Sequence, residues 1–206
     1  MNQSREKIIL HDAIECLAAA LEAKDHYTQG HSNRVADTSL VLSHKLDING
    51  LGLEQIHIAA HLHDIGKIGV PDYILNKVER LTPDEWEQIK QHPVIGYNIL
   101  SNSTELKEVA TIVLYHHERW DGKGYPNGLK NEEIPLGSRI IGICDAIDAM
   151  ISSRPYREAL TMKQILSELK LGSGSQFDPN ILKTVDVHQL LKEISSIHKE
   201  SVSVYI

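Results

Sequence analysis

The chain has 206 residues, 41% of them hydrophobic, and a formal net charge of −7. This length favours one well-cored domain. The acidic balance excludes a general nucleic-acid-binding surface, so an anionic substrate must be held by local positive charge. No run is apolar enough to cross a bilayer, the amino terminus does not resemble a secretory leader, and two cysteines are too few for a disulfide framework. We therefore expect a cytoplasmic protein.

Helical periodicity recurs along the chain, and no segment alternates like a strand for long. The first pattern covers residues 8–24, and the second covers residues 30–46, where Ser32 is placed to cap a helix. The later patterns predict helices over residues 53–67, 83–91, 93–100, 105–117, 136–152, 161–171 and 178–199. Asp178 and Pro179 suit the first positions of the last helix. We expect an all-α fold.

The stretch HLHDIGKIGVPD, residues 61–72, places His63, Asp64 and Lys67 among apolar residues. On a helix these three side chains project from one side, which is the side that should be buried. An unpaired carboxylate there costs on the order of several kcal/mol. A metal ion would remove this cost. The alternative is a buried salt bridge between Asp64 and Lys67, beside a histidine that is satisfied within the core.

Further histidines and aspartates accompany this stretch. His116 and His117 follow an apolar helical pattern, and because neighbours on a helix diverge by about 100°, both can be ligands only if they reach different ions. Asp145 lies in another apolar helix, and His31 and His92 lie at predicted helix starts. Imidazoles and carboxylates without thiolates suit Fe, Mn, Zn or Ni, and two metals that share an aspartate suit phosphoester hydrolysis.

Six segments occur in the order of one family's motifs: YTQGHSNRV, HDIGKIGVPD, LTPDEWEQIKQHPVIG, HHERWDGKGYP, EEIPLGSRIIGICDAIDAM and SSRPYR. Over about residues 25–179 the chain closely resembles the HD-GYP family. This is a branch of the HD phosphohydrolases whose members cleave cyclic di-GMP to linear pGpG and, in some cases, on to GMP. The resemblance implies an HD-domain helical bundle with extra HD-GYP helices and a catalytic domain over residues 25–185. Residues 1–24 would be an N-terminal helix or a linker, and residues 186–206 a C-terminal helix or tail.

Matching positions imply a dinuclear metal centre that activates a hydroxide, with Asp64 as the bridging ligand. Fe or Mn are the expected ions, and Ni or Zn are alternatives. The residues that the resemblance implies as metal ligands are His31, His63, Asp64, His92, His116, His117 and Asp145.

The same matching implies the substrate contacts. Lys67 would neutralise charge that develops on the phosphate, and it joins Asp64 as an expected catalytic residue. The residues implied in substrate binding are Lys67, Arg154, Arg157, Gly124, Tyr125 and Pro126. The last three form the family's namesake loop, which has been linked to cyclic di-GMP binding and to docking of a diguanylate cyclase domain.

One position departs from the family pattern. Members with a third metal carry a glutamate four residues before the first histidine ligand, where this chain has Tyr27. We therefore expect two ions. The rival function is a catalytically silent module that docks a diguanylate cyclase domain, but such modules usually lose ligands, and here the dinuclear set is complete. Pairing of the first helix in a homodimer is left open.

The remaining histidines are expected to lie outside the metal site. His57 and His61 are four apart, as a metal pair would be, but they point to another side of the helix from His63. The histidines expected at the surface or at helix caps are His11, His26, His44, His188 and His198. The acidic candidates to orient ligand imidazoles, or else to form plain salt bridges, are Glu118, Asp121 and Asp148. Trp86 and Trp120 are expected to pack rather than to stack on a base.

Overall fold

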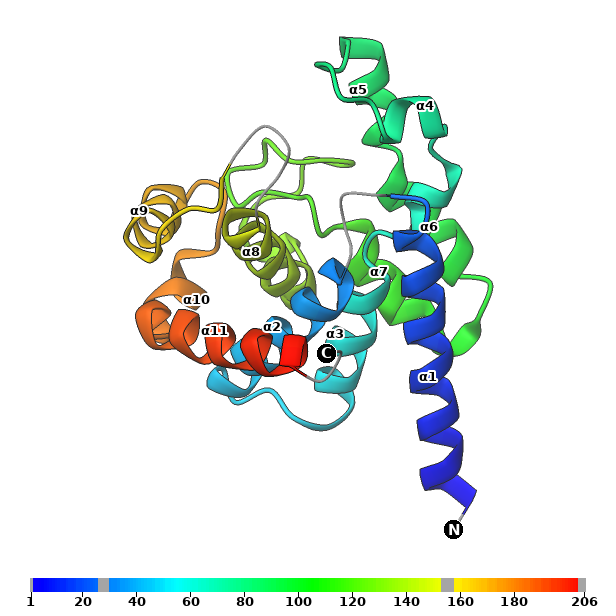
Figure 1. The fold of residues 1–206 in the computed structure, drawn as a ribbon, viewed down its shortest axis with the longest axis horizontal. Helices are drawn as coiled ribbons and strands as arrows, with labels where there is room; N and C mark the ends of the chain where they lie inside the picture. Colours follow the sequence, from blue (N-terminus) through cyan, green and yellow to red (C-terminus); the bar gives the residue numbers. More distant parts are fainter. Residues whose placement is uncertain (1, 26–29, 153–157, 204–206) are drawn as a thin grey trace.

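The computed structural model describes residues 2–25, 30–152 and 158–203. Within these residues every regular element is a helix, apart from an isolated bridge between Ser173 and Phe177. The expected all-α fold is confirmed (Figure 1). None of the helices in the described part of the chain is both long and apolar enough to cross a bilayer.

The central helices pack around one hydrophobic core. They are α2 (His31–Lys45), α3 (Gly50–Leu62), α7 (Lys107–Leu114) and α8 (Leu136–Ile151). Helix α2 packs on both α3 and α8, and α3 packs on α7. Fully buried small and branched side chains, such as Ala59, Ala60 and Ile140, let these helices approach closely.

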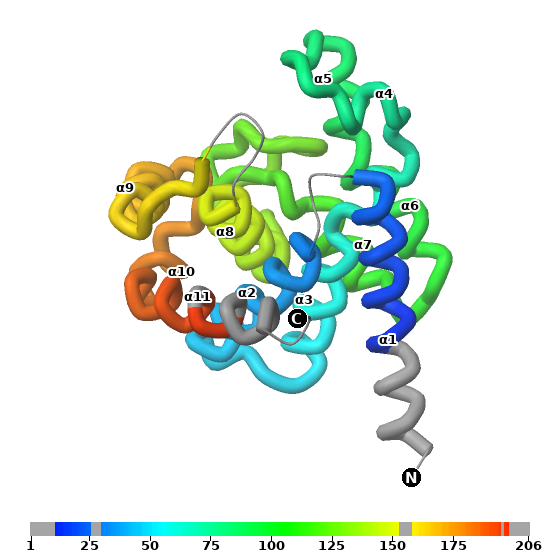
Figure 2. The backbone as a smooth tube through the Cα atoms, viewed as in Figure 1, coloured from blue at the N-terminus to red at the C-terminus, as the bar shows by residue number. Residues whose placement is uncertain are grey.

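The remaining helices surround this core. Helix α1 (Asn2–Glu22) packs along α3, and α4 and α5 project together at the top of the view in Figures 1 and 2. The other α-helices are α4 (Asp72–Leu75), α5 (Pro83–Ile89), α6 (His92–Leu100), α9 (Met162–Gly172), α10 (Pro179–Thr184) and α11 (Val187–Ser203). Three short 3₁₀ helices are η1 (Ile65–Gly69), η2 (Thr104–Leu106) and η3 (Asn131–Glu133).

Several helices end earlier than the sequence pattern predicts. Helix α3 stops at Leu62, and the chain continues as η1, in which the amide of Lys67 donates to the carbonyl of Asp64 at 2.8 Å. Residues three apart eclipse one another in a 3₁₀ helix, so Asp64 and Lys67 still share a side although the single helix expected over residues 53–67 is wrong. Helix α7 likewise ends at Leu114, before the tandem histidines.

The expected helix over residues 178–199 is two helices. Asp178 caps α10 as predicted, accepting from the amide of Asn180 at 2.8 Å. The chain then breaks at Val185, and α11 starts after Asp186, whose carboxylate accepts from the amide of Gln189 at 3.0 Å. The predicted cap at Ser32 is also wrong, because Ser32 already lies within α2.

A glycine brings η1 against α6. A Cβ atom added at Gly66 would lie 1.8 Å from the carbonyl oxygen of His92 and 2.5 Å from the amide nitrogen of Gly96. Only a residue without a side chain permits this approach of two backbones. The contact places the segment that carries Asp64 beside the start of α6, which carries His92.

Candidate metal centre

The structure gathers the seven predicted metal ligands at the ends and inner faces of different helices. His31 is the first residue of α2, His92 is the first residue of α6, and Asp145 lies within α8. The other four follow the ends of α3 and α7: His63, Asp64, His116 and His117. Four of the seven are 5% exposed or less: His63, Asp64, His92 and His116.

Asp64 lies at the middle of this cluster. One carboxylate oxygen, Oδ2, is 3.4 Å from Nε2 of His63 and 3.7 Å from Nε2 of His31. The other oxygen, Oδ1, is 3.4 Å from Nε2 of His92. The two oxygens therefore face two separate groups of imidazoles, which is the arrangement that a carboxylate shared by two ions requires.

The two groups are completed by neighbouring side chains. Nε2 of His31 lies 3.5 Å from Oδ1 of Asp145, so Asp145 extends the first group. In the second group the ring centroids of His116 and His117 are 4.0 Å apart, and those of His92 and His117 are 5.0 Å apart. The tandem histidines thus reach the same group, contrary to the expectation that they would serve different ions. They do so because both follow the end of α7.

Hydrogen bonds fix the tautomers of the histidines. In three of them Nδ1 lies within 2.8 Å of the carbonyl oxygen three residues earlier: His63 with Ala60, His92 with Ile89, and His116 with Val113. A carbonyl can only accept, so each Nδ1 carries the hydrogen and, in the neutral ring, each Nε2 presents a lone pair. All three lone pairs point into the cluster.

The facing nitrogen atoms show that the cluster suits cations. Nε2 of His31 is 3.2 Å from Nε2 of His63, and Nε2 of His92 is 3.4 Å from Nε2 of His116. The His92 and His116 nitrogens are both hydrogen-free acceptors, so no hydrogen bond joins them in their neutral forms. A metal ion between such lone pairs converts a repulsive contact into coordination. The donor set of imidazoles and carboxylates is the one that Fe, Mn, Ni and Zn accept.

The protonation states favour the same conclusion. Burial lowers the pKa of His92 and of His116 to about 4, and burial together with the neighbouring imidazoles lowers the pKa of His117. Burial alone would raise the pKa of Asp64, but Lys67 and the surrounding imidazoles hold it well below its ordinary value. At neutral pH His92, His116 and His117 are therefore neutral and the Asp64 carboxylate is ionised, which are the forms that bind metals. His31 differs, because burial would lower its pKa but its contacts with Asp148, Asp145 and Asp64 raise it, so metal binding there would displace a proton.

Lys67 joins two carboxylates beside the cluster. Its Nζ lies 2.7 Å from Oδ2 of Asp64 and 3.0 Å from Oδ2 of Asp25. Burial would lower the pKa of Lys67, but the two carboxylates raise it above its ordinary value, so the ammonium stays charged. The salt bridge that the sequence left as an alternative is present, and it coexists with the histidine cluster. Sequence reasoning missed Asp25, which follows α1 and reaches Lys67 only through the packing of α1 on η1.

Asp148 holds the first histidine of the cluster in place. Nδ1 of His31 donates to Oδ2 of Asp148 at 2.7 Å, and Nε of Arg34 donates to Oδ1 at 2.6 Å. Asp148 thus makes the contact expected of a residue that orients a ligand imidazole. Glu118 and Asp121 are directed elsewhere. Glu118 accepts from two backbone amides of the following loop, and Oδ2 of Asp121 lies 2.8 Å from Nη2 of Arg119 in a salt bridge. Arg34 was not anticipated, although it lies one turn after His31.

The namesake loop of the predicted family lies against the cluster. The ring of Tyr125 packs on the ring of His117, with 4.9 Å between centroids, and Nζ of Lys90 lies 5.9 Å from the Tyr125 centroid. The loop passes so close to the preceding segment that a Cβ atom at Gly124 would lie 2.4 Å from the amide nitrogen of Arg119. The loop therefore lies next to the cluster, at the edge of the space in which a substrate would bind. Arg154, Arg157 and Tyr27 lie outside the described residues.

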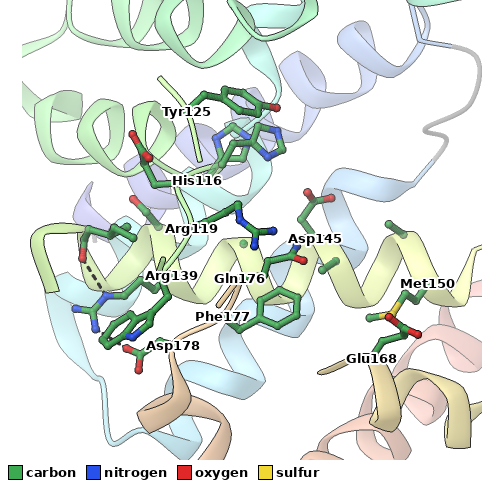
Figure 3. Close-up of a pocket in the computed structure, with 18 of the residues that line it drawn as sticks. His116, Arg119, Tyr125, Arg139, Asp145, Met150, Glu168, Gln176, Phe177 and Asp178 are labelled. Atoms are coloured by element: carbon green, nitrogen blue, oxygen red, sulfur yellow. Dashed lines mark hydrogen bonds and ion pairs between the residues drawn. The ribbon is translucent and has the colours of Figure 1, made fainter. Parts of the chain in front are cut away.

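A cavity of about 450 Å³ opens beside the cluster, and His116, His117 and Asp145 form part of its wall. Figure 3 shows Tyr125 and His116 on one side of it and Arg139 and Asp178 on the other. The cavity also contains cationic and aromatic side chains, which sequence reasoning did not assign to a site: Trp86, Arg119, Trp120, Arg139 and Phe177. Its volume falls within the range of small-molecule sites, roughly 300–1,000 Å³.

The described residues form an all-helical fold around a buried histidine and aspartate cluster that could hold metal ions. The HD domain family model matches residues 15–181, so the chain belongs to the HD domain family. Its expected place in the HD-GYP branch is also confirmed by the relatives that it matches.

The chain is similar to proteins with named activities. It is 41% identical to a protein of Thermotoga maritima named cyclic di-GMP phosphodiesterase, over 92% of this chain and 52% of the relative. It is 38% identical to 3'3'-cGAMP-specific phosphodiesterase 2 of Vibrio cholerae, over 84% of this chain and 33% of the relative. The chain thus spans about half or less of the length of these curated relatives.

A solved structure has the same fold. Bd1817 of Bdellovibrio bacteriovorus, described as an HDG"Y"P protein, superimposes with a TM-score of 0.64 at 21% identity, over 79% of this chain and 51% of that one. At this level of identity the likeness concerns the fold alone.

Proposed function

We propose that residues 25–185 form the catalytic domain of a metal-dependent phosphodiesterase that hydrolyses a cyclic dinucleotide. Cyclic di-GMP is the proposed substrate, pGpG the first product, and GMP the product of a second cleavage. The observation that carries this proposal is the set of tautomer-fixed Nε2 atoms around the two oxygens of Asp64. The names of the curated relatives support the substrate class.

Two dications are proposed for the site, with Fe or Mn preferred and Ni or Zn as alternatives. His31, His63 and Asp145 would hold one ion, the histidines of the second group would hold the other, and Asp64 would bridge the two. When bound, the ions lower the pKa of a water molecule that attacks phosphorus and stabilise charge on the phosphoryl oxygens. The proposed count of two rests on Tyr27, which stands where members with a third metal carry glutamate.

The side chains of the chain itself would bind and orient the cyclic dinucleotide. The Lys67 ammonium, held 2.7 Å from Asp64, is placed to neutralise charge that develops on a phosphate beside the bridging carboxylate. Arg154 and Arg157 are proposed to bind phosphates. A base can enter the neighbouring cavity, where Cζ of Arg139 lies 5.8 Å from the ring centroid of Trp120.

Incubation of the metal-loaded protein with cyclic di-GMP tests this proposal. The protein is loaded anaerobically with Fe²⁺ or Mn²⁺, and products are resolved by chromatography, with 3'3'-cGAMP as a second substrate. We expect pGpG from cyclic di-GMP and none from an Asp64→Ala control. Faster cleavage of 3'3'-cGAMP would reassign the substrate. If the folded, metal-loaded protein cleaves neither compound, the proposed phosphodiesterase activity is refuted. The rival function, a module that docks a diguanylate cyclase domain through residues 124–126, is then favoured.

The partners of the domain are proposed on the same resemblance. A diguanylate cyclase domain would dock on the Gly124 to Pro126 loop, and α1 would pair in a homodimer. The molecular mass of the protein alone in solution tests the homodimer. The molecular mass of a mixture with a cyclase domain tests the docking.

A further inference from the structure

A second group of histidines lies between α1 and α3. One ligand atom from each of His11, His57 and His61 lies within 4.8 Å of the others. The ring centroids of His57 and His61 are 4.7 Å apart, and that of His11 is 5.6 Å from each. The two helices that supply these rings pack side by side (Figures 1 and 2).

The spacing in each helix suits chelation. His57 and His61 are four residues apart on α3, so their rings share one side of that helix. His11 and Glu15 are four residues apart on α1, and Nε2 of His11 lies 3.3 Å from Oε1 of Glu15. Two pairs of potential donors therefore face each other across the junction of the helices.

The burial of His61 points to a missing partner. His61 is 3% exposed, yet neither of its ring nitrogens has a hydrogen-bond partner among the described residues. Buried polar atoms in folded proteins nearly always have a partner, so an imidazole without one requires an explanation. A ligand bound to one of the ring nitrogens of His61 would supply the missing partner.

His57 offers an unpartnered nitrogen to the same space. Its Nδ1 atom is buried and has no hydrogen-bond partner among the described residues. Burial and the neighbouring ring of His11 lower the pKa of His57, which keeps it neutral at physiological pH. Neutral imidazole is the form that binds metals.

This group is separate from the candidate catalytic centre. His61 and His63 are two positions apart, which corresponds to about 200° around a helix, so the two side chains point to opposite sides. His63 faces Asp64, whereas His61 faces α1. His11 is exposed, as expected of a surface histidine, but the packing of α1 on α3 also brings its ring to His57 and His61.

We propose that His11, His57 and His61, with Glu15 as a fourth donor, bind a Zn²⁺ ion that ties α1 to α3. Three imidazoles and a carboxylate match the donors and the fourfold coordination that zinc prefers. The exposed His11 and Glu15 side chains can close on the ion by rotamer changes, while His57 and His61 are already held by the core helix. The ion would fix α1 to the helix that leads into the candidate catalytic centre.

Zinc counting tests this proposal. Wild-type protein, His11→Gln and the double variant H11Q/H57Q are dialysed to equilibrium against buffered Zn²⁺, and bound zinc is measured by mass spectrometry. His44→Gln is the matched control, because His44 is an exposed histidine near the end of α2 and outside both clusters. Circular dichroism establishes that each variant is folded.

We expect wild type and H44Q to bind one equivalent more than H11Q/H57Q, and H11Q to bind this equivalent at least tenfold more weakly. Zinc should also raise the unfolding temperature of wild type more than that of H11Q. Equal zinc content and affinity in wild type and the double variant would overturn the proposal. If the double variant does not fold, unchanged zinc affinity in H11Q alone overturns it, because His11 is exposed and its replacement leaves the core intact.

Discussion

Asp148→Asn tests whether a residue that touches no substrate positions a metal ligand. Asp148 is buried in α8, and its carboxylate accepts from Nδ1 of His31 at 2.7 Å and from Nε of Arg34 at 2.6 Å. The amide of asparagine keeps the shape but removes the charge. His31 then loses the anionic acceptor that fixes its tautomer, and its Nε2 becomes a poorer donor to a metal.

The pKa of Asp148 gives the size of the effect. Burial by itself raises this pKa, but the hydrogen bonds from His31 and Arg34 lower it to about 2, against an ordinary value of 3.8. A shift of this size corresponds to about 2 kcal/mol of stabilisation of the folded chain by the ionised carboxylate. Because the folded-state pKa is the lower one, this stabilisation is complete above pH 4 and is lost as the pH falls toward 2. Loss of a carboxylate partner also weakens metal binding by roughly 10–100-fold.

Two measurements check the prediction for D148N. In denaturant unfolding of chelator-treated proteins, the free energy of unfolding of D148N should be about 2 kcal/mol below that of wild type at pH 7. The difference between the two proteins should be smaller below pH 4. Competition with a chelator should show Mn²⁺ bound at least tenfold more weakly. Asp72→Asn is the control, since Asp72 forms an exposed ion pair 3.3 Å from Lys24 and both quantities should stay as in wild type. Unchanged Mn²⁺ affinity in folded D148N would refute the reasoning.

Three further results are expected. Lys67→Ala should lower turnover of cyclic di-GMP about 100-fold while metal content measured by mass spectrometry stays at the wild-type level, because a protonated amine cannot ligate a metal; equal loss of metal would contradict this role. Gly66→Ala should lower the free energy of unfolding measured with denaturant by about 3 kcal/mol, because the new Cβ atom would lie 1.8 Å from the carbonyl oxygen of His92. Gly52→Ala is the control and should raise the unfolding temperature, because the nearest atom to its new Cβ is 3.7 Å away. Removing metal with a chelator should lower the unfolding temperature by about 4 °C or more, and Mn²⁺ should restore it; an unchanged midpoint would mean that the facing imidazoles are stable without cations.

The sequence was sufficient to predict that the seven candidate ligands belong to one metal centre. His63 and Asp64 lie in an apolar run, and Asp145 lies in an apolar helix, so burial of polar groups could be inferred from composition alone. The order of the motifs then supplied the other members of the set. The structure adds what spacing could not provide, namely that the two oxygens of Asp64 face different groups of imidazoles.

Contacts between distant helices could not be predicted from local patterns. Asp148 reaches His31 across 117 positions, and Lys67 reaches Asp25 across 42. Such pairs depend on how α2 packs on α8 and how α1 packs on η1, and neither relation is encoded in helical periodicity. The group formed by His11 and α3 was missed for the same reason, since the spacing of His57 and His61 gives no information about which helix lies opposite.

Three of the helices that end earlier than predicted share a feature at their carboxyl ends. The last carbonyl groups of a helix lack partners within the helix, and in three places a histidine beyond the helix end donates its Nδ1 hydrogen to one of them. The carbonyls belong to Ala60 near the end of α3, Ile89 at the end of α5 and Val113 near the end of α7. Each of these three helices ends before its histidine, and the imidazole supplies a hydrogen-bond donor to a carbonyl in the last turn. The same hydrogen bond fixes the tautomer, so at all three helix ends Nε2 is the nitrogen that is available to a metal.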